Sequence, residues 1–162
     1  MIPDPDDYRA AAALLARLRE RGLRLATAES CTGGLVASLI TAIPGASDVF
    51  ERGFVTYSNA AKTELLGVPA ALIAAHGAVS EAVARAMAAG AQAHAAAEIA
   101  LAITGVAGPG GGSAEKPVGL VWFGLARAGE ARALAKKFVG SRDAIRACAT
   151  REAIRLLQEF VI

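Results

Sequence analysis

Apolar segments of strand length alternate with helical segments over most of the chain, and this order constrains the fold more than any other feature. Five such segments occur, at residues 23–28, 52–58, 99–104, 119–127 and 132–139. The last two flank the turn Ala128-Gly129-Glu130, which predicts a β-hairpin. Strands joined by helices pair in parallel, whereas a hairpin adds antiparallel strands. The pattern therefore predicts an α/β fold, a three-layer α/β/α sandwich around a mixed five-stranded sheet.

Capping residues delimit the helices between these strands. The expected helices start at Asp4-Pro5, Leu35, Asn59, Pro69, Ser80-Glu81 and Ser141. The first ends at Gly22 and the third at Gly67, because glycine often closes a helix. Pro44-Gly45 ends the second. No linker interrupts this series, so we expect residues 1–162 to form a single domain with its own core.

Composition excludes several classes of protein. Hydrophobic residues make up 54% of the chain, which excludes a disordered segment. No apolar run reaches the roughly 18 residues of a membrane span, and no basic and apolar secretory signal opens the sequence. The net charge of +2 is scattered rather than gathered in a nucleic-acid-binding stripe. We expect a cytoplasmic protein that binds neither membrane nor nucleic acid and keeps its two cysteines reduced. The alanine-rich helix after Ser80, taken as a surface helix, favours a homo-oligomer, either a dimer or a trimer.

The stretch Thr27–Ile40, TAESCTGGLVASLI, places two hydroxyls, a thiol and two glycines where a helix should begin. Ligands of open α/β sheets bind at such strand-to-helix turns, at the carboxyl ends of strands. Ser30 would stand there beside the unpaired helix-start amides of Thr32, Gly33 and Gly34, which suit an oxyanion or a phosphate. The alternative is that Ser30 or Thr32 only caps the helix.

A second glycine-rich loop, Gly105–Pro117, follows the expected core strand at 99–104. Its five glycines between Gly105 and Gly112 exceed what a simple connection needs, and their amides can wrap a phosphate or a ribose. The loop matches neither the P-loop nor the GxGxxG pattern. Taken alone, it is equally compatible with a mobile connection.

Lys62 is the third feature. If Asn59 caps its helix, Lys62 occupies the third helical position, where a cation opposes the helix dipole. This misfit predicts a lowered pKa and hence a neutral amine, and a neutral lysine can serve as the base for a serine nucleophile. The alternative is an ordinary solvated surface lysine.

Other catalytic sites have weaker support. The chain has only two histidines, and neither lies in a motif that suggests a serine triad. Cys31 is an alternative nucleophile, although a buried structural cysteine is the simpler interpretation. No cluster of histidine, cysteine and carboxylate residues has metal-ligand spacing, so we expect neither a metal nor another cofactor.

Several motifs occur together and resemble the CinA C-terminal domain family. They are TAESCTGG, FERGFVTYSNAAKTELLGV, HGAVSE, ITGVAGPGGGSAEKPVGLVWFG and SRDAIR. The resemblance extends from about Leu14 to Leu157 and implies a three-layer sandwich around a five-stranded mixed sheet. Larger members of the family carry an additional N-terminal domain, whereas its stand-alone members are nicotinamide mononucleotide deamidases. This chain resembles the stand-alone form.

The resemblance also implies a reaction and its residues. The family hydrolyses the carboxamide of nicotinamide mononucleotide to nicotinic acid mononucleotide and ammonia, within NAD salvage, without a cofactor. Its catalytic residues correspond to Ser30, Lys62 and Tyr57. The expected contacts to this small-molecule nucleotide substrate come from Thr32, Gly33, Gly34, Thr104, Gly105, Ala107, Gly108, Gly110 and Arg142. We expect neutral Lys62 to take the proton of Ser30, which then attacks the amide carbon.

One position departs from the family pattern, and two other functions stay open. Many members carry an acidic residue where this chain has Ser141, while Arg142 and Arg146 both remain available for the substrate phosphate. A non-catalytic nucleotide-binding regulatory module would keep the glycine-rich loops but would not need Lys62. An amidase for a related amide would keep Ser30 and Lys62 but would not need a phosphate site.

Overall fold

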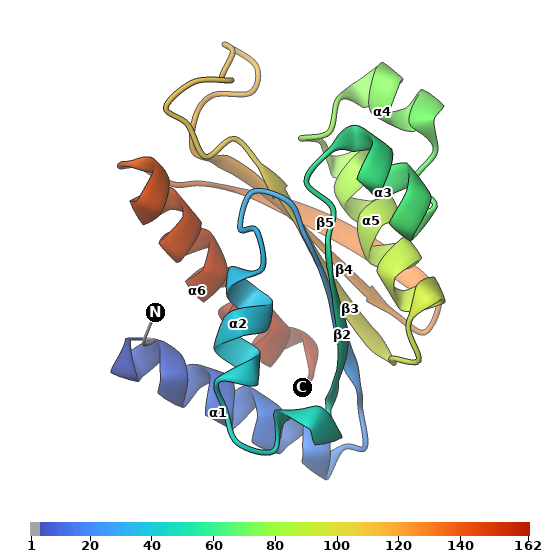
Figure 1. Cartoon of the computed structure of the whole chain (residues 1–162), viewed down its shortest axis with the longest axis vertical. Coiled ribbons are helices and arrows are strands. Elements are labelled where there is room, and N and C mark those ends of the chain that lie inside the picture. Colours follow the sequence, from blue (N-terminus) through green and yellow to red (C-terminus); the bar gives the residue numbers. More distant parts are fainter. Residues whose placement is uncertain (1–3) are drawn as a thin grey trace.

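The computed structural model describes residues 4–162, which form one five-stranded sheet between two layers of helices (Figure 1). The strands are β1 (Leu25–Glu29), β2 (Phe50–Val55), β3 (Ile99–Gly105), β4 (Leu120–Arg127) and β5 (Glu130–Lys137). The helices are α1 (Pro5–Glu20), α2 (Leu35–Thr41), α3 (Asn59–Leu66), α4 (Ala70–His76), α5 (Glu81–His94) and α6 (Arg142–Phe160), and a short 3-10 helix spans Ala46–Asp48. The predicted three-layer α/β/α fold is confirmed. The expected domain bounds include residues 1–3, which lie outside the described residues.

The order of strands in the sheet is β2-β1-β3-β4-β5. β1 pairs in parallel with both β2 and β3, whereas β4 is antiparallel to β3 and to β5. The carboxyl ends of β1, β2 and β3 therefore meet at one end of the sheet, where ligands of open α/β sheets bind. Figure 1 shows the loop after β1 and the long loop after β3 at this same upper end.

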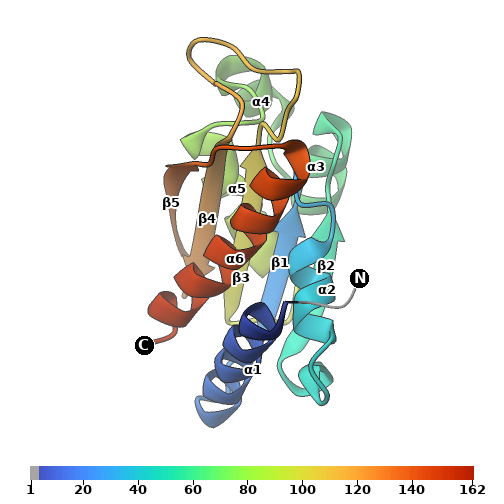
Figure 2. The ribbon, with the colours of Figure 1, turned by 90° about the vertical axis from the view of Figure 1, so that its left-hand side faces the viewer.

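Alternation along the strands divides the core into two halves. Leu101 and Ile103 of β3 pack with α1, α2 and α6, whereas Ala100 and Ala102 pack with α5 and its neighbours (Figures 1 and 2). The helix α5 packs very close to the sheet, because a Cβ atom added at Gly124 of β4 would lie 2.1 Å from the carbonyl oxygen of Ala84 in α5. Three of the seven alanines of α5 are buried against the sheet (Ala84, Ala88 and Ala91), two are partly buried, and Ala89 and Ala93 are exposed. One face of this alanine-rich helix is therefore covered by the sheet and the other is exposed, and the homo-oligomer stays a prediction.

The second strand differs from its predicted bounds of 52–58 because both of its ends lie earlier in the chain. β2 is an edge strand, which tolerates charges such as that of Glu51 inside it. Its last expected residues leave the sheet to begin α3. Ser58 Oγ accepts from the N–H of Ala61 at 3.0 Å, so Ser58 rather than Asn59 caps this helix. Lys62 therefore lies one position further from the helix start than expected.

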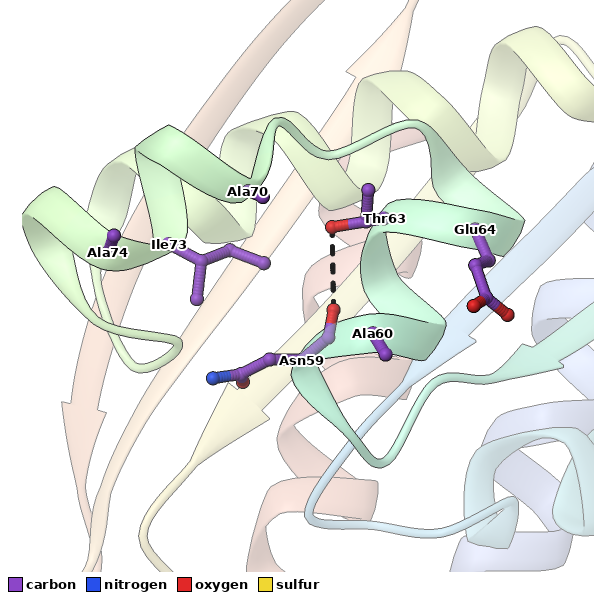
Figure 3. Close-up of a pocket in the computed structure, with 7 residues that line it drawn as sticks. All are labelled: Asn59, Ala60, Thr63, Glu64, Ala70, Ile73 and Ala74. Carbon is purple, nitrogen blue, oxygen red and sulfur yellow. Dashed lines mark hydrogen bonds between the residues drawn. The ribbon is translucent and has the colours of Figure 1, made fainter.

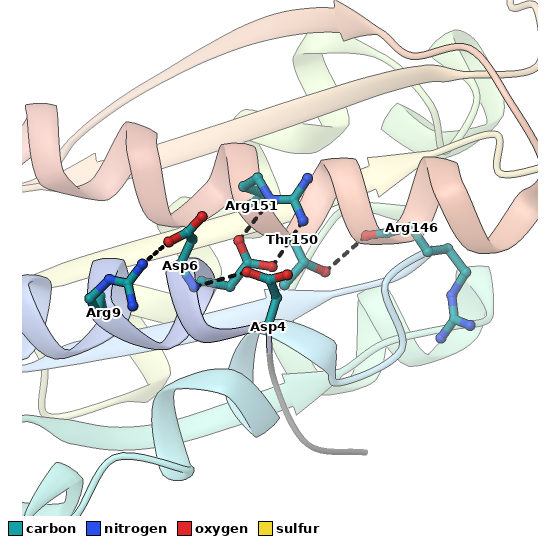
Figure 4. A network of polar contacts seen from close by, with 7 residues as sticks. Asp4, Asp6, Arg9, Arg146, Thr150 and Arg151 are labelled. Carbon is teal, nitrogen blue, oxygen red and sulfur yellow. Dashed lines mark hydrogen bonds and ion pairs between the residues drawn. The ribbon is translucent and has the colours of Figure 1, made fainter.

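Polar contacts fix α6 against α1 (Figure 4). Asp4 caps α1 by accepting from the N–H of Asp6 at 2.8 Å, and the guanidinium of Arg151 pairs with both oxygens of Asp7 at 2.7 and 3.1 Å. Ser141 caps α6, as predicted. The Arg151–Asp7 pair joins α6 to α1, and Arg146 in the first turns of α6 reaches the loop after β1. None of the helices within residues 4–162 is long and apolar enough to cross a bilayer.

Candidate active site

Ser30 lies directly after β1, at the carboxyl end of the parallel strands. Its N–H donates to the carbonyl of Ile103 at 2.9 Å, and its own carbonyl accepts from the N–H of Gly33 at 3.0 Å, which closes a turn. Gly33 and Gly34 have φ values of 59° and 97°, a backbone region that side chains disfavour. The two glycines therefore permit the tight passage from strand to helix.

A carboxylate of the chain itself occupies the start of α2. Glu29 is fully buried, and its Oε2 accepts from the N–H groups of Gly34 and Val36, both at 3.1 Å. Its Oε1 accepts from the N–H of Ala37 at 2.9 Å. The N-cap residue is Gly34, which has no side chain, so neither Ser30 nor Thr32 caps the helix. Of the three amides expected to bind an anion at the helix start, those of Gly33 and Gly34 are thus already engaged, and Glu29 balances the helix dipole.

Lys62 reaches Ser30 from α3 on the opposite layer. Its side chain is 1% exposed, and Nζ lies 3.1 Å from Ser30 Oγ. Nζ also donates to the carbonyl of Thr56 at 2.8 Å and lies 3.5 Å from that of Tyr57. A neutral amine has two N–H groups and one lone pair. The two carbonyls can take both N–H groups, which leaves the lone pair for the hydroxyl of Ser30.

Burial lowers the pKa of Lys62, because an ammonium group loses its hydration in this position. No carboxylate within residues 4–162 forms an ion pair with it. The predicted direction of the shift is therefore confirmed. Its main cause is burial, and not the position at the helix start from which the shift was predicted.

A test of this burial is the pH dependence of stability. Between the lowered pKa of Lys62 and about 10.4, the unfolded chain binds a proton that the folded chain does not. Wild-type stability should therefore rise with pH in this window, by at most about 1.4 kcal/mol per pH unit, relative to Lys62→Met. Urea unfolding of both proteins between about pH 7 and 10 measures the difference. Parallel pH profiles would show that the amine is not desolvated in the folded state.

Tyr57 and Arg142 meet at the mouth of the site. Arg142 Nη2 donates to the hydroxyl of Tyr57 at 3.0 Å, and Nη1 donates to the carbonyl of Gly108 at 2.8 Å. The side chain of Tyr57 is 62% exposed, so its hydroxyl lies at the entrance and not beside Ser30. Arg142 thus connects the loop after β2 with the glycine-rich loop after β3.

A cavity of about 220 Å³ joins these parts. It is lined by Ser30, Cys31, Tyr57, Asn59, Lys62, Ala78, Val79, Thr104, Gly105, Ala107 and Arg142. Seven of the expected site residues are in this lining, whereas Thr32, Gly33, Gly34, Gly108 and Gly110 are not. Ala78 and Val79 belong to the motif HGAVSE, but no binding role was predicted for them, because small apolar residues in a loop do not by themselves indicate a binding site. Asn59 had a signal, but it was interpreted only as a cap.

The alternative nucleophile lies in the same lining but is poorly suited to the chemistry. Burial raises the pKa of the Cys31 thiol to about 11, so it stays protonated at neutral pH. Within the described part of the chain, no three histidine, cysteine or acidic residues gather to hold a metal ion. The geometry favours Ser30 over Cys31 as the nucleophile.

A second cavity, of about 390 Å³, lies between α3 and α4 (Figure 3). It is lined by Asn59, Ala60, Thr63, Glu64, Ala70, Ile73 and Ala74. Asn59 contributes to both cavities, but this one contains neither a nucleophile with a base nor a cation. The Ser30–Lys62 pair therefore makes the smaller cavity the candidate active site.

Comparisons with known proteins agree with this architecture. The model of the CinA C-terminal domain family matches residues 7–161. A CinA-like protein from Anaeromyxobacter sp. (strain K) is 54% identical over 145 residues, which are 90% of this chain and 36% of that protein. One from Geobacter sp. (strain M21) is 53% identical over 90% of this chain and 35% of its own length. The chain thus spans about a third of the length of these curated relatives.

Solved structures match over nearly their full length. The competence/damage inducible protein CihA from Agrobacterium tumefaciens is 42% identical with a TM-score of 0.94, covering 98% of both chains. A competence-damaged protein (CinA) superfamily member from Escherichia coli is 37% identical with a TM-score of 0.92, covering 99% of this chain and 94% of that one. The chain therefore belongs to the CinA C-terminal domain family.

Proposed function

We propose that this domain is an amidohydrolase that converts nicotinamide mononucleotide to nicotinic acid mononucleotide and ammonia. The observation that carries the proposal is the buried amine of Lys62, which lies 3.1 Å from Ser30 Oγ and forms no ion pair with a carboxylate of residues 4–162. A neutral lysine beside a serine hydroxyl is a nucleophile with its base. A regulatory module that only bound a nucleotide would have no need to bury this group.

The proposed reaction has two stages. Lys62 takes the proton of Ser30 as Oγ attacks the amide carbon, and N–H groups of the chain stabilise the oxyanion. The C–N bond then breaks, and ammonia leaves with the proton that Lys62 returns. Water hydrolyses the resulting ester with Lys62 again as the base. Every proton transfer in this scheme uses the one amine in contact with Ser30.

Arg142 supports a phosphorylated substrate. Its guanidinium lines the cavity and donates only to the uncharged oxygens of Gly108 and Tyr57. No acidic side chain within residues 4–162 pairs with it, so its full charge is available to an anion at the entrance. A phosphate forms strong bidentate contacts with such a group. The substrate phosphate would then anchor the nucleotide while its carboxamide reaches Ser30.

Ammonia release from three related compounds tests the proposal. Nicotinamide mononucleotide should be hydrolysed, whereas nicotinamide riboside, which lacks the phosphate, should show a kcat/KM lower by at least about a hundredfold, or roughly 2.7 kcal/mol. Free nicotinamide should be poorer still. Equal efficiency on the riboside would favour an amidase without a phosphate site. Binding of the nucleotide with no ammonia release would favour the regulatory module.

A further inference from the structure

The loop that carries Ser30 is held from two sides by charged side chains. On one side, the Glu29 carboxylate accepts from amides at the start of α2. On the other side, Arg146 of α6 donates from Nε to the carbonyl of Cys31 at 3.1 Å and from Nη2 to the carbonyl of Thr32 at 3.2 Å. The Glu29 carboxylate thus accepts hydrogen bonds from N–H groups of this segment, and the Arg146 guanidinium donates hydrogen bonds to its carbonyl groups.

The guanidinium of Arg146 directs its hydrogen bonds to this loop. Figure 4 shows its guanidinium directed away from Arg151, which pairs with α1. It forms no ion pair within the described residues and does not line the cavity around Ser30. A Cβ atom added at Gly33 would lie 3.4 Å from Nη2, so the backbone and the guanidinium are in close contact. Arg146 is therefore poorly placed to hold a substrate phosphate, unlike Arg142.

These contacts set the direction of the neighbouring N–H groups. In a trans peptide, the carbonyl of one residue and the N–H of the next point in opposite directions. Because Arg146 holds the carbonyl of Cys31, the N–H of Thr32 points away from Arg146. Because the carbonyl of Ser30 accepts from Gly33, the N–H of Cys31 points out of the turn.

Two amides next to the nucleophile are thereby left free. Within residues 4–162, no backbone or side-chain oxygen accepts from the N–H groups of Cys31 and Thr32, although the amides of Ser30, Gly33 and Gly34 are all engaged. Cys31 lines the cavity beside Ser30. Thr32 is fully buried behind the cavity lining, and its hydroxyl also has no partner among these residues. Buried donors without acceptors are rare and require an explanation.

We infer that Arg146, together with Glu29, is a positioning residue that fixes the Ser30–Gly34 backbone so that the free N–H group of Cys31, in the cavity lining beside the nucleophile, receives the acyl oxygen during attack by Ser30. This inference rests on the proposed amide hydrolysis. Oxyanion donors act mainly on the transition state, so their displacement lowers kcat more than it raises KM. Loss of a phosphate contact would instead raise KM.

The test compares three arginine variants. Arg146→Ala should lower kcat by about a hundredfold with little change in KM, the usual effect of losing one oxyanion donor. Arg142→Ala, at the cavity mouth, should act mainly on KM. Arg155→Ala is the matched control, because it removes an exposed arginine of the same helix whose hydrogen bonds within residues 4–162 go to Glu152 and Glu159. Wild-type kcat in Arg146→Ala, or a change in KM alone, overturns the inference.

Two further measurements separate a positioning role from loss of folding. Added guanidinium ions should restore part of the kcat of Arg146→Ala but should not rescue Arg142→Ala. Only Arg146→Ala leaves a site between two backbone carbonyls that a free guanidinium ion can occupy. Arg146→Lys can reach one of the two carbonyls and should fall between wild type and Arg146→Ala. Glu29→Gln, which can accept fewer N–H groups, should also lower kcat. A folded Arg146→Ala that guanidinium does not restore contradicts the inference.

A fluorophosphonate probe distinguishes this inference from the proposed function. The probe forms a P–O bond with an activated serine and releases fluoride, and it needs the same oxyanion donors but no nucleotide. If the wild type labels at Ser30 without hydrolysing nicotinamide mononucleotide, the proposed substrate is wrong, and slower labelling of Arg146→Ala still supports the inference. Equal labelling of Arg146→Ala and wild type overturns the inference even if the deamidase activity is present. Absence of both labelling and hydrolysis in the wild type overturns both.

Discussion

Replacing Ser30 with alanine should abolish ammonia release from nicotinamide mononucleotide, with kcat lowered by at least about a thousandfold. The reason is that Ser30 Oγ is the nucleophilic atom in contact with the buried amine of Lys62. The affinity for the nucleotide should stay within about tenfold, or roughly 1.4 kcal/mol, because the entrance around Arg142 is unchanged. Steady-state rates and calorimetric titration of the variant measure the two effects separately.

Cys31→Ala is the matched control for this experiment. Cys31 lies next to Ser30 and lines the same cavity, but its raised pKa keeps the thiol protonated. The variant should keep most of the activity and should still label at Ser30. An active Ser30→Ala together with an inactive Cys31→Ala would assign the chemistry to the thiol.

The fold was largely predictable because its signals are local. Ser80 and Ser141 cap their helices as their positions in the sequence predict, and the hairpin of β4 and β5 follows from its turn. The predicted bounds of β2 were wrong because the ends of this strand depend on tertiary contacts. It pairs with β1 from Phe50, and the carbonyl of Thr56, just beyond the strand, accepts from Lys62. Such contacts leave no local pattern.

In the candidate site, too, the residues with a local sequence signal could be predicted, whereas those defined by tertiary contacts could not. Ser30 and Lys62 could be singled out because each contradicts its local context, a hydroxyl among glycines and a cation near a helix start. Glu29 could not, since a carboxylate at the end of a strand is ordinary. Arg146 was considered only as a possible phosphate ligand, because an arginine in an amphipathic helix does not reveal which backbone it contacts. The contact of Arg146 with Cys31 spans 115 positions in the chain. Only the packing of α6 beside the carboxyl end of β1 shows what these two residues hold.

The reaction rate should rise with pH along a single ionisation that lies below that of free lysine, about 10.4. The direction follows from the proposed role, because the base must be neutral to accept the proton of Ser30. Below the lowered pKa of Lys62 the amine is charged and inactive, and above it the amine is neutral and active. The measurement is kcat/KM for nicotinamide mononucleotide across the pH range in which the protein stays folded.

Lys62→Met should lose both the activity and this ionisation, because methionine is similar in length but cannot accept a proton. Lys62→Arg should be nearly as poor, since arginine stays charged at every accessible pH. A loss of about a hundredfold or more in kcat is expected for either variant, the usual contribution of a general base. The two variants separate two roles for the amine, because an arginine can replace a fixed positive charge but not a base. Substantial activity in Lys62→Arg would show that Lys62 serves as a charge, and the base would then have to be sought among the other groups of the cavity, with Tyr57 the first to test.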